Sequence, residues 1–205
     1  MDITKLQLVL KKGGVNQSNI NTYAPILNKY FTKENFSDEN IYRFLANALN
    51  ETGCFTVLRE NMSYSTPDRL RAVFPSIFVK GGYDANKYVH NAQALGNLVY
   101  DSRIWPMKKG LGNTQDGDGY KYRGGGFFQT TGRSGYEILS KASGIDFTSN
   151  PNLITQPEYA VRSAIEFWKF FNLSSKPNLT EVRRVIGGSL FGLDTVTQYY
   201  NKMKT

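Results

Sequence analysis

Residues 37–53 read SDENIYRFLANALNETG, and this stretch has the pattern of a buried helix. Ser37 suits the N-cap, because its hydroxyl can accept a hydrogen bond from a backbone N–H of the first turn. The two acidic residues that follow favour the positive end of a helix, and Gly53 favours its termination. Apolar side chains recur on one face: Ile41, Phe44, Leu45, Ala48 and Leu49. We therefore predict a core helix between Ser37 and Gly53.

Helical patterns continue on both sides of this stretch. We predict further helices over residues 3–11, 19–31, 67–73, 84–100, 136–143, 157–171, 179–186 and 193–203. Residues 54–66 are rich in aromatic and β-branched side chains, which favours a short hairpin or an extended segment. Residues 110–135 contain nine glycines and favour a loop. The sequence thus predicts one mainly α domain over residues 1–205, with a minor β or extended region.

The chain has 205 residues and a formal net charge of +8, which favours polyanionic partners such as nucleic acid, an anionic membrane or an anionic cell-wall polymer. The cationic residues are scattered, and no nucleic-acid recognition motif accompanies them, so we do not expect nucleic acid as a partner. No apolar run approaches the roughly 18 residues of a membrane-spanning helix. We therefore expect no stable insertion into a membrane.

Cys54 is the only cysteine, so an internal disulfide is excluded and folding in a reducing cytoplasm is favoured. The first residues lack a cationic segment followed by an apolar one, and we expect no secretory signal. His90 is the only histidine, so the chain cannot build a zinc site of His and Cys ligands. We expect no metal and no cofactor. A Cys54–His90 peptidase pair is an alternative, but a lone cysteine beside Phe55 more often packs as a small apolar residue.

Two glutamates, Glu51 and Glu60, are the strongest candidates for chemistry. Glu51 falls on the apolar face of the predicted helix, seven residues after Phe44, so its carboxyl group is expected to be partly desolvated. Desolvation favours the neutral form, which can donate a proton to a leaving oxygen. The alternative is a solvated glutamate at a helix end, which is the commonest fate of this residue type.

Glu60 follows Arg59 and precedes Asn61. In a glycosidase it would serve as the general base that activates a water molecule, with the two carboxyl groups about 6.5–9.5 Å apart for inversion and about 5 Å apart for retention. The alternative for Glu60 is an ion pair at the surface, with no role in catalysis.

The glycine-rich run lacks the spacing of a phosphate-binding loop, so we do not expect it to bind a nucleotide. Its glycines allow the backbone to approach a ligand closely. Gln129, Thr130 and Thr131 then offer hydrogen-bonding groups, and a threonine hydroxyl can hold a water molecule for a nearby carboxylate. A turn-rich surface loop without function is the alternative.

Five segments resemble glycoside hydrolase family 19 in order and spacing, from about residue 41 to residue 171. They are FLANALNETG (44–53), ENMSYS (60–65), LRAVFP (70–75), GDGYKYRGGGFFQTTGR (117–133), and the pair NP (150–151) with QPEYA (156–160). Each segment alone is weak, but five in register are specific.

The resemblance implies a lysozyme-like, two-lobed helical fold with a substrate groove. It also implies an inverting hydrolase of β-1,4-linked N-acetylhexosamine polymers, in which Glu51 is the acid, Glu60 is the base and Thr131 positions water. Gln129, Tyr122 and Arg123 match positions that bind sugar or shape the loop, and Asn61 and Tyr64 are also expected to bind substrate. The chain departs from the family pattern at Asn50, Gly135 and Ile186, and these changes affect individual substrate contacts.

Phage members of the family act on peptidoglycan and plant members on chitin. The compact, basic chain without disulfides resembles the phage endolysins. We therefore expect a monomer that is made in the cytoplasm of a bacterial host without a signal peptide and that acts on peptidoglycan at the cell wall after release. Three alternatives remain: a chitinase, a lytic transglycosylase, and a non-catalytic wall-binding or virion protein that keeps the fold.

Overall fold

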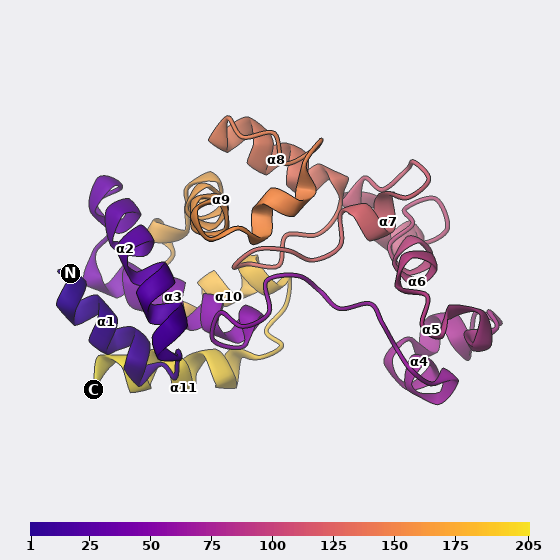
Figure 1. The fold of residues 1–205 in the computed structure, drawn as a ribbon, viewed down its shortest axis with the longest axis horizontal. Coiled ribbons are helices and arrows are strands. Elements are labelled where there is room, and N and C mark those ends of the chain that lie inside the picture. The colour runs from indigo at the N-terminus through magenta and orange to yellow at the C-terminus, as the bar shows by residue number, and fades with distance from the viewer. The chain divides into compact units, whose positions relative to one another are not determined.

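A computed structural model describes all residues from 1 to 205, and its regular secondary structure is almost entirely helical (Figure 1). The α-helices are α1 (Ile3–Lys12), α2 (Gln17–Lys33), α3 (Asp38–Thr52), α4 (Pro67–Val73), α5 (Pro75–Phe78), α6 (Ala92–Val99), α7 (Asp118–Lys121), α8 (Arg133–Ser143), α9 (Pro157–Phe170), α10 (Leu179–Gly187) and α11 (Leu193–Lys204). Four short 3-10 helices join them: η1 (Ala85–Tyr88), η2 (Pro106–Leu111), η3 (Pro151–Thr155) and η4 (Leu173–Ser175). The predicted mainly α fold class is confirmed. None of the helices has the length and apolar character needed to cross a bilayer.

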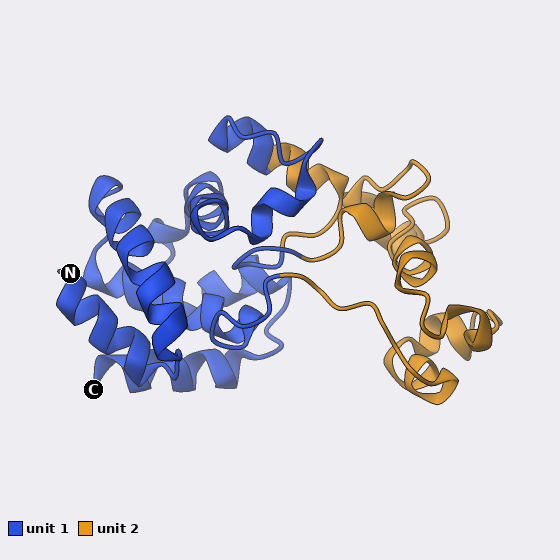
Figure 2. Cartoon of the chain, viewed as in Figure 1, with its two compact units in different colours: residues 1–58, 125–129, 139–205 blue, residues 59–124, 130–138 orange.

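The chain forms two compact units, which Figure 2 colours separately. Unit 1 contains Met1–Leu58, Gly125–Gln129 and Leu139–Thr205. Unit 2 contains Arg59–Gly124 and Thr130–Ile138. The glycine-rich run therefore contributes to both units. The expectation of a single domain over the whole chain stays a prediction.

Helix α3 is the central element of unit 1, as its apolar pattern predicts. Its first turn is capped by the Ser37 hydroxyl, which accepts a 3.2 Å hydrogen bond from the Asn40 backbone N–H. It ends at Gly53, which adopts left-handed backbone angles. Between these ends its apolar face is fully buried and packs against α10 and α11. Helix α1 packs on α2 and α11, and α2 packs on α9.

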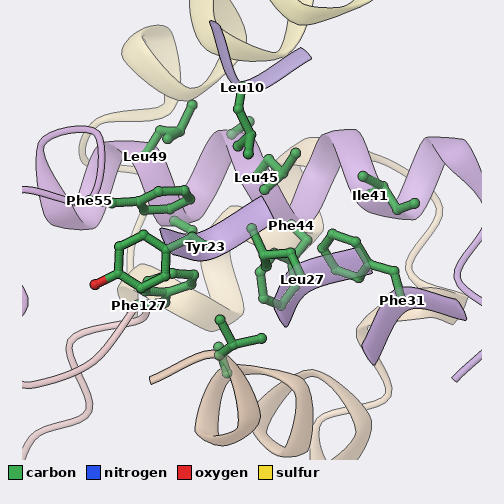
Figure 3. Close-up of a cluster of buried hydrophobic side chains, with 14 of the residues drawn as sticks. Leu10, Tyr23, Leu27, Phe31, Ile41, Phe44, Leu45, Leu49, Phe55 and Phe127 are labelled. Carbon is green, nitrogen blue, oxygen red and sulfur yellow. The ribbon is translucent and has the colours of Figure 1, made fainter. Parts of the chain in front are cut away.

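Aromatic side chains pack among aliphatic ones in the core of unit 1 (Figure 3). The Phe44 ring lies 4.9 Å from Phe128 and 5.4 Å from Trp168, measured between centroids. The Phe55 and Phe127 rings are stacked 4.4 Å apart with an interplanar angle of 2°. Each such ring stabilises the fold by about 1.5–3 kcal/mol through burial alone. Because Phe127 and Phe128 belong to the glycine-rich run, the core anchors that run.

Unit 2 has a smaller apolar core of its own. Its buried members are Met62, Leu70, Ile77, Phe78, Ala85, Leu95, Leu98 and Val99. Met62 comes from the segment after Glu60, and the others come from α4, α5, η1 and α6. This core therefore holds the segment that carries Glu60 against a helical base.

The prediction of one helix over residues 84–100 is wrong. The segment forms η1 and then α6, with His90 in the left-handed region at φ 56° between them. Asn91 restarts the helix, since its side chain accepts a 3.1 Å hydrogen bond from the Ala94 N–H. The glycine-rich region also contains more regular structure than predicted, because it includes the single-turn helix α7 and the start of α8.

Residues 54–66 form no hairpin and follow the extended alternative. Within unit 1, the Gly126 N–H donates to the Leu58 carbonyl at 2.9 Å. Within unit 2, the Glu60 N–H donates to the Gly124 carbonyl at 2.9 Å. The extended segment thus finds its backbone partners in the glycine-rich run and not in its own neighbours.

Candidate active site

Glu51 lies in the last turn of α3, and its side chain is 17% exposed, in agreement with the predicted partial burial. Arg183 of α10 forms an ion pair with its Oε1 atom. The Asn50 side-chain amide donates to the same oxygen at 3.2 Å. No protein group donates to Oε2. The two carboxylate oxygens are therefore unequal: one is held, and the other is available.

Arg183 is buried, with 5% of its side chain exposed, and sequence reasoning did not identify it. Its Nε atom donates to the Phe191 carbonyl at 2.9 Å, while its Nη1 atom contacts Glu51. Gly187, one turn further along α10, makes room for it, since a Cβ atom there would lie 2.6 Å from the guanidinium. The neighbouring Arg184 is exposed and pairs with Glu181. Helical position was the only signal in the sequence that could separate these two arginines.

An open pocket of about 780 Å³ exposes the Glu51 carboxylate. It lies entirely within unit 1. Its lining residues are Asn50, Glu51, Arg183, Leu190, Phe191, Gly192, Leu193, Asp194 and Thr195. The pocket therefore combines two carboxylates and a buried cation with a wall formed by the loop between α10 and α11 and by the start of α11.

Glu60 is held in unit 2 by neutral donors. Its Oε1 atom accepts a 2.7 Å hydrogen bond from the Tyr100 hydroxyl, and its Oε2 atom accepts a 3.1 Å hydrogen bond from the Gly124 N–H. Arg59 donates at 2.8 Å to the Tyr136 hydroxyl. Both carboxylate oxygens of Glu60 are therefore held by hydrogen bonds from neutral groups. This arrangement differs from the surface ion pair that was the alternative for Glu60.

Tyr100, just after α6, is the second contact that sequence reasoning missed. Burial raises the pKa of its hydroxyl well above the usual range, and the nearby charge of Glu60 raises it further. The phenol therefore stays protonated and remains a hydrogen-bond donor. The Lys108 Nζ atom lies 5.2 Å from the centre of the ring. Tyr100 and Glu60 are 40 positions apart in the sequence, so no local sequence pattern predicts this hydrogen bond.

Two of the predicted substrate residues, Tyr122 and Arg123, have structural contacts that shape the loop. Tyr122 is fully buried, and its ring lies 5.3 Å from that of Tyr136. The Arg123 guanidinium lies 3.9 Å from the centre of the Tyr120 ring, and its Nε atom donates to the Glu60 carbonyl at 3.3 Å. Burial lowers the pKa of Arg123. These contacts fit the loop-shaping alternative for both residues.

The remaining predicted residues lie at accessible or half-buried positions. Asn61 is exposed, and its side chain accepts a 2.8 Å hydrogen bond from the Ser63 N–H. Tyr64 packs edge-on against Phe74, and burial, followed by the charge of Glu60, raises the pKa of its hydroxyl. Gln129 has φ 48° and donates to the Gly126 carbonyl at 3.1 Å. Thr131 is half-buried.

These residues are divided between the two units. Unit 1 contains Glu51 and Gln129, and unit 2 contains Glu60 and Thr131. Because the two carboxylates belong to different units, their pairing across a groove stays a prediction. The structure contains no cluster of three or more His, Cys, Asp or Glu side chains that could hold a metal ion.

Comparison with known proteins gives the family. No protein-family model matches the chain. A curated protein from Haemophilus influenzae, described as a glycosyl hydrolase family 19 domain-containing protein, is 30% identical over 163 residues. The match covers 78% of this chain and 76% of that protein. Identity at this level over most of both chains confirms the resemblance carried by the five sequence segments, and the chain belongs to glycoside hydrolase family 19.

Proposed function

We propose that the chain is a phage-type endolysin that hydrolyses β-1,4 bonds in the glycan strands of bacterial peptidoglycan. The observation that carries the proposal is the position of Glu51 on the wall of an open pocket, in a chain of a glycosidase family. A carboxyl group at such a position can reach the oxygen of a bound polymer.

Glu51 is the general acid in this proposal. Arg183 and Asn50 hold Oε1, so Oε2, the oxygen without a protein donor, is the atom that faces the leaving group and transfers the proton in this proposal. When the bond between the anomeric carbon and the glycosidic oxygen breaks, this proton moves to the leaving oxygen. The sugar ring passes through an oxocarbenium-like transition state, which the resulting carboxylate stabilises by its charge.

Glu60 is the general base. The Tyr100 hydroxyl and the Gly124 N–H orient its carboxylate, and each oxygen keeps a further lone pair for water. Thr131, in the same unit, holds the water molecule. Glu60 takes one proton of that water as its oxygen bonds to the anomeric carbon, so the product has the inverted configuration.

The net charge of +8 favours peptidoglycan over chitin, because bacterial walls are polyanionic and chitin is neutral. In this proposal the enzyme is made in the cytoplasm of the bacterial host, where the free thiol of Cys54 is stable, and reaches the wall after release. It acts as a monomer and needs no cofactor.

The test measures release of reducing ends from purified sacculi by wild type, Glu51→Gln and Glu60→Gln. Glu137→Gln, at an exposed position of α8, is the matched control. We expect both site variants to lose at least about a hundredfold in rate, and the control to keep wild-type activity. Near-normal release by both site variants would end the proposal.

Product and substrate analysis separates the alternatives. Mass spectrometry of the products distinguishes addition of water from the anhydro sugar ends that a lytic transglycosylase leaves. Faster cleavage of soluble chitin oligomers than of sacculi would assign a chitinase. Binding to sacculi without any release of reducing ends would assign a non-catalytic wall-binding protein.

A further inference from the structure

Phe191 is the most exposed of the large apolar side chains that lie at the surface, at 87%. A single exposed apolar side chain is common in soluble proteins, so exposure alone does not indicate a function. The position of Phe191 does indicate one, because Phe191 lines the same pocket as Glu51. Leu190 beside it is 40% exposed and lines that pocket too.

The backbone of Phe191 is fixed although its ring is free. The Phe191 N–H donates to the Ser189 hydroxyl at 3.2 Å, and the Phe191 carbonyl accepts from Arg183 Nε at 2.9 Å. Left-handed backbone angles at Gly188 and Gly192 allow the tight loop that presents the ring. A ring on an anchored backbone needs little further ordering when a ligand arrives.

One guanidinium connects this ring to the proposed acid. Arg183 contacts Glu51 through Nη1 and the Phe191 carbonyl through Nε. Because Arg183 is buried and planar, it fixes the backbone that carries the ring relative to the carboxylate. The backbone that carries the ring is therefore held near the acid inside unit 1.

The chemistry of the pocket favours a sugar. A pyranose ring presents a face of C–H groups, which packs on an aromatic plane, and an edge of hydroxyl groups, which needs hydrogen bonds. Phe191 and Leu190 supply the apolar surface, while Asn50, Asp194 and Thr195 supply polar groups in the same pocket. We infer that Phe191 is the stacking platform for an N-acetylhexosamine unit next to the bond that Glu51 protonates. This inference rests on the proposed function of the site.

The test titrates the β-1,4-linked tetramer of N-acetylglucosamine into the full chain and follows binding by calorimetry. Each binding variant is made in the Glu51→Gln background, so that the ligand is not consumed. We expect Phe191→Ala to weaken binding by about tenfold, the loss expected when the sugar would cover part of the ring, and Phe191→Tyr to keep the affinity of the Glu51→Gln parent. Phe170→Ala removes another exposed ring, at the end of α9 outside the pocket, and is expected to change nothing.

Steady-state rates on sacculi, measured with Glu51 intact, supply the second readout. A platform for binding predicts that Phe191→Ala raises KM and leaves kcat within about twofold. Unchanged affinity and unchanged KM in Phe191→Ala would overturn the inference while leaving the hydrolase proposal in place. If binding depends on Phe191 but the wild type releases no reducing ends, the hydrolase proposal would be overturned and Phe191 would remain a sugar-binding residue. Phe191-dependent binding to anionic phospholipid vesicles, with none to the tetramer, would assign the ring to a membrane surface and also overturn the inference.

Discussion

The two candidate catalytic glutamates are held by different kinds of contact. Glu51 has a buried cationic neighbour, Arg183, at one oxygen, whereas Glu60 has neutral donors at both. A cation stabilises the carboxylate that remains after proton donation, and neutral donors orient a base without satisfying its charge. The two carboxylates thus differ in their contacts: Glu51 has a charged partner at one oxygen only, and Glu60 has neutral donors at both oxygens.

Removal of the Tyr100 hydroxyl tests the role of these donors. We expect Tyr100→Phe to lower kcat by about ten- to a hundredfold, because a hydrogen bond to a charged group contributes roughly 1.5–3 kcal/mol. KM should change little, since the phenol contacts the base and not the sugar. The matched control is Tyr88→Phe, at a half-buried tyrosine that packs against the core of the same unit. Equal kcat values for Tyr100→Phe and wild type would remove Tyr100 from the account.

Gly187 tests the contact between Arg183 and Glu51. A Cβ atom at this position would lie 2.6 Å from the Arg183 guanidinium, so Gly187→Ala should displace that group from Glu51. We expect a loss of at least about tenfold in kcat, with a melting temperature close to that of wild type. Gly110→Ala, where an added Cβ meets nothing within 4 Å, is the control. Full activity of Gly187→Ala would show that the Arg183 contact is dispensable.

The residues that sequence analysis found and missed differ in how local their signals are. Partial burial of Glu51 follows from its place on one helix face. Arg183 and Tyr100 lie 132 and 40 positions away from their partners, and only the folded chain brings them together. A single sequence does not indicate which residues form such long-range pairs.

At the scale of elements, the stability of the site depends on how α3 ends. Gly53, Cys54 and Phe55 all have positive φ, between 54° and 65°. The Asn19 side chain supports this turn by donating to the Phe55 carbonyl at 3.0 Å. Phe55 then stacks on Phe127. The turn therefore connects the end of the helix that carries Glu51 to the glycine-rich run.

Truncation of Phe55 tests the importance of this connection. We expect Phe55→Ala to lower the free energy of unfolding by about 3–5 kcal/mol, because it removes a fully buried ring and leaves a cavity. Urea denaturation measures the change. Phe171→Ala, at a partly exposed ring just after α9, should cost far less. Similar losses for both variants would contradict the structural role of the stack.

Helices α2 and α9 are joined by a contact that depends on pH. Glu158 accepts 2.8 Å hydrogen bonds from the Lys29 ammonium and the Tyr30 hydroxyl, and chiefly the first of these lowers its pKa below 4.5. A lowered pKa in the folded state means that the contribution to stability is present above pH 4.5 and is lost as the pH falls through the folded-state pKa.

We therefore expect Glu158→Gln to be less stable than wild type at neutral pH, and the difference to shrink as the pH falls below 4.5. Urea denaturation at several pH values measures it, with the exposed Glu137→Gln as the control. A difference that is constant with pH would contradict a role for the charge.

Element prediction succeeded where one apolar face persists for several turns. The patterns of α3 and α9 specify their helices almost to the residue, because burial and backbone geometry agree there. It failed over residues 84–100, where Asn91 caps a new helix after His90 turns the chain. When a polar side chain ends one helix by capping the next, the apolar residues keep almost the same spacing. The pattern of apolar residues therefore does not reveal the interruption.

At the scale of the whole molecule, the charge of +8 predicts salt-sensitive attachment to the wall. We expect the bound fraction on purified sacculi to fall steeply as NaCl rises from about 0.05 M to about 0.5 M, because screening shortens the range of the attraction. Binding to neutral chitin beads is the control and should change much less. Binding to sacculi that is independent of salt would contradict the peptidoglycan assignment.

The mainly helical fold and the family could be predicted from the chain alone, since apolar periodicity and five segments in register both act along the sequence. The resemblance implied two lobes, but the residues that bound the two compact units could not be predicted, because Leu58 and Arg59 are adjacent in the chain yet belong to different units. Glu51 and Glu60 belong to different units, so their cooperation in one reaction is best tested by measuring reaction rates.

The most direct measurement is therefore the cleavage rate of an N-acetylglucosamine oligomer that carries either a sugar or a dinitrophenolate as leaving group. An acid is needed only when the leaving oxygen must be protonated, whereas a base is needed for both substrates. We predict that Glu51→Gln cleaves the activated substrate at a near wild-type rate and the natural one hardly at all, and that Glu60→Gln cleaves neither. Equal losses of Glu51→Gln on both substrates, or cleavage of either one by Glu60→Gln at the wild-type rate, would contradict the assignment of acid and base.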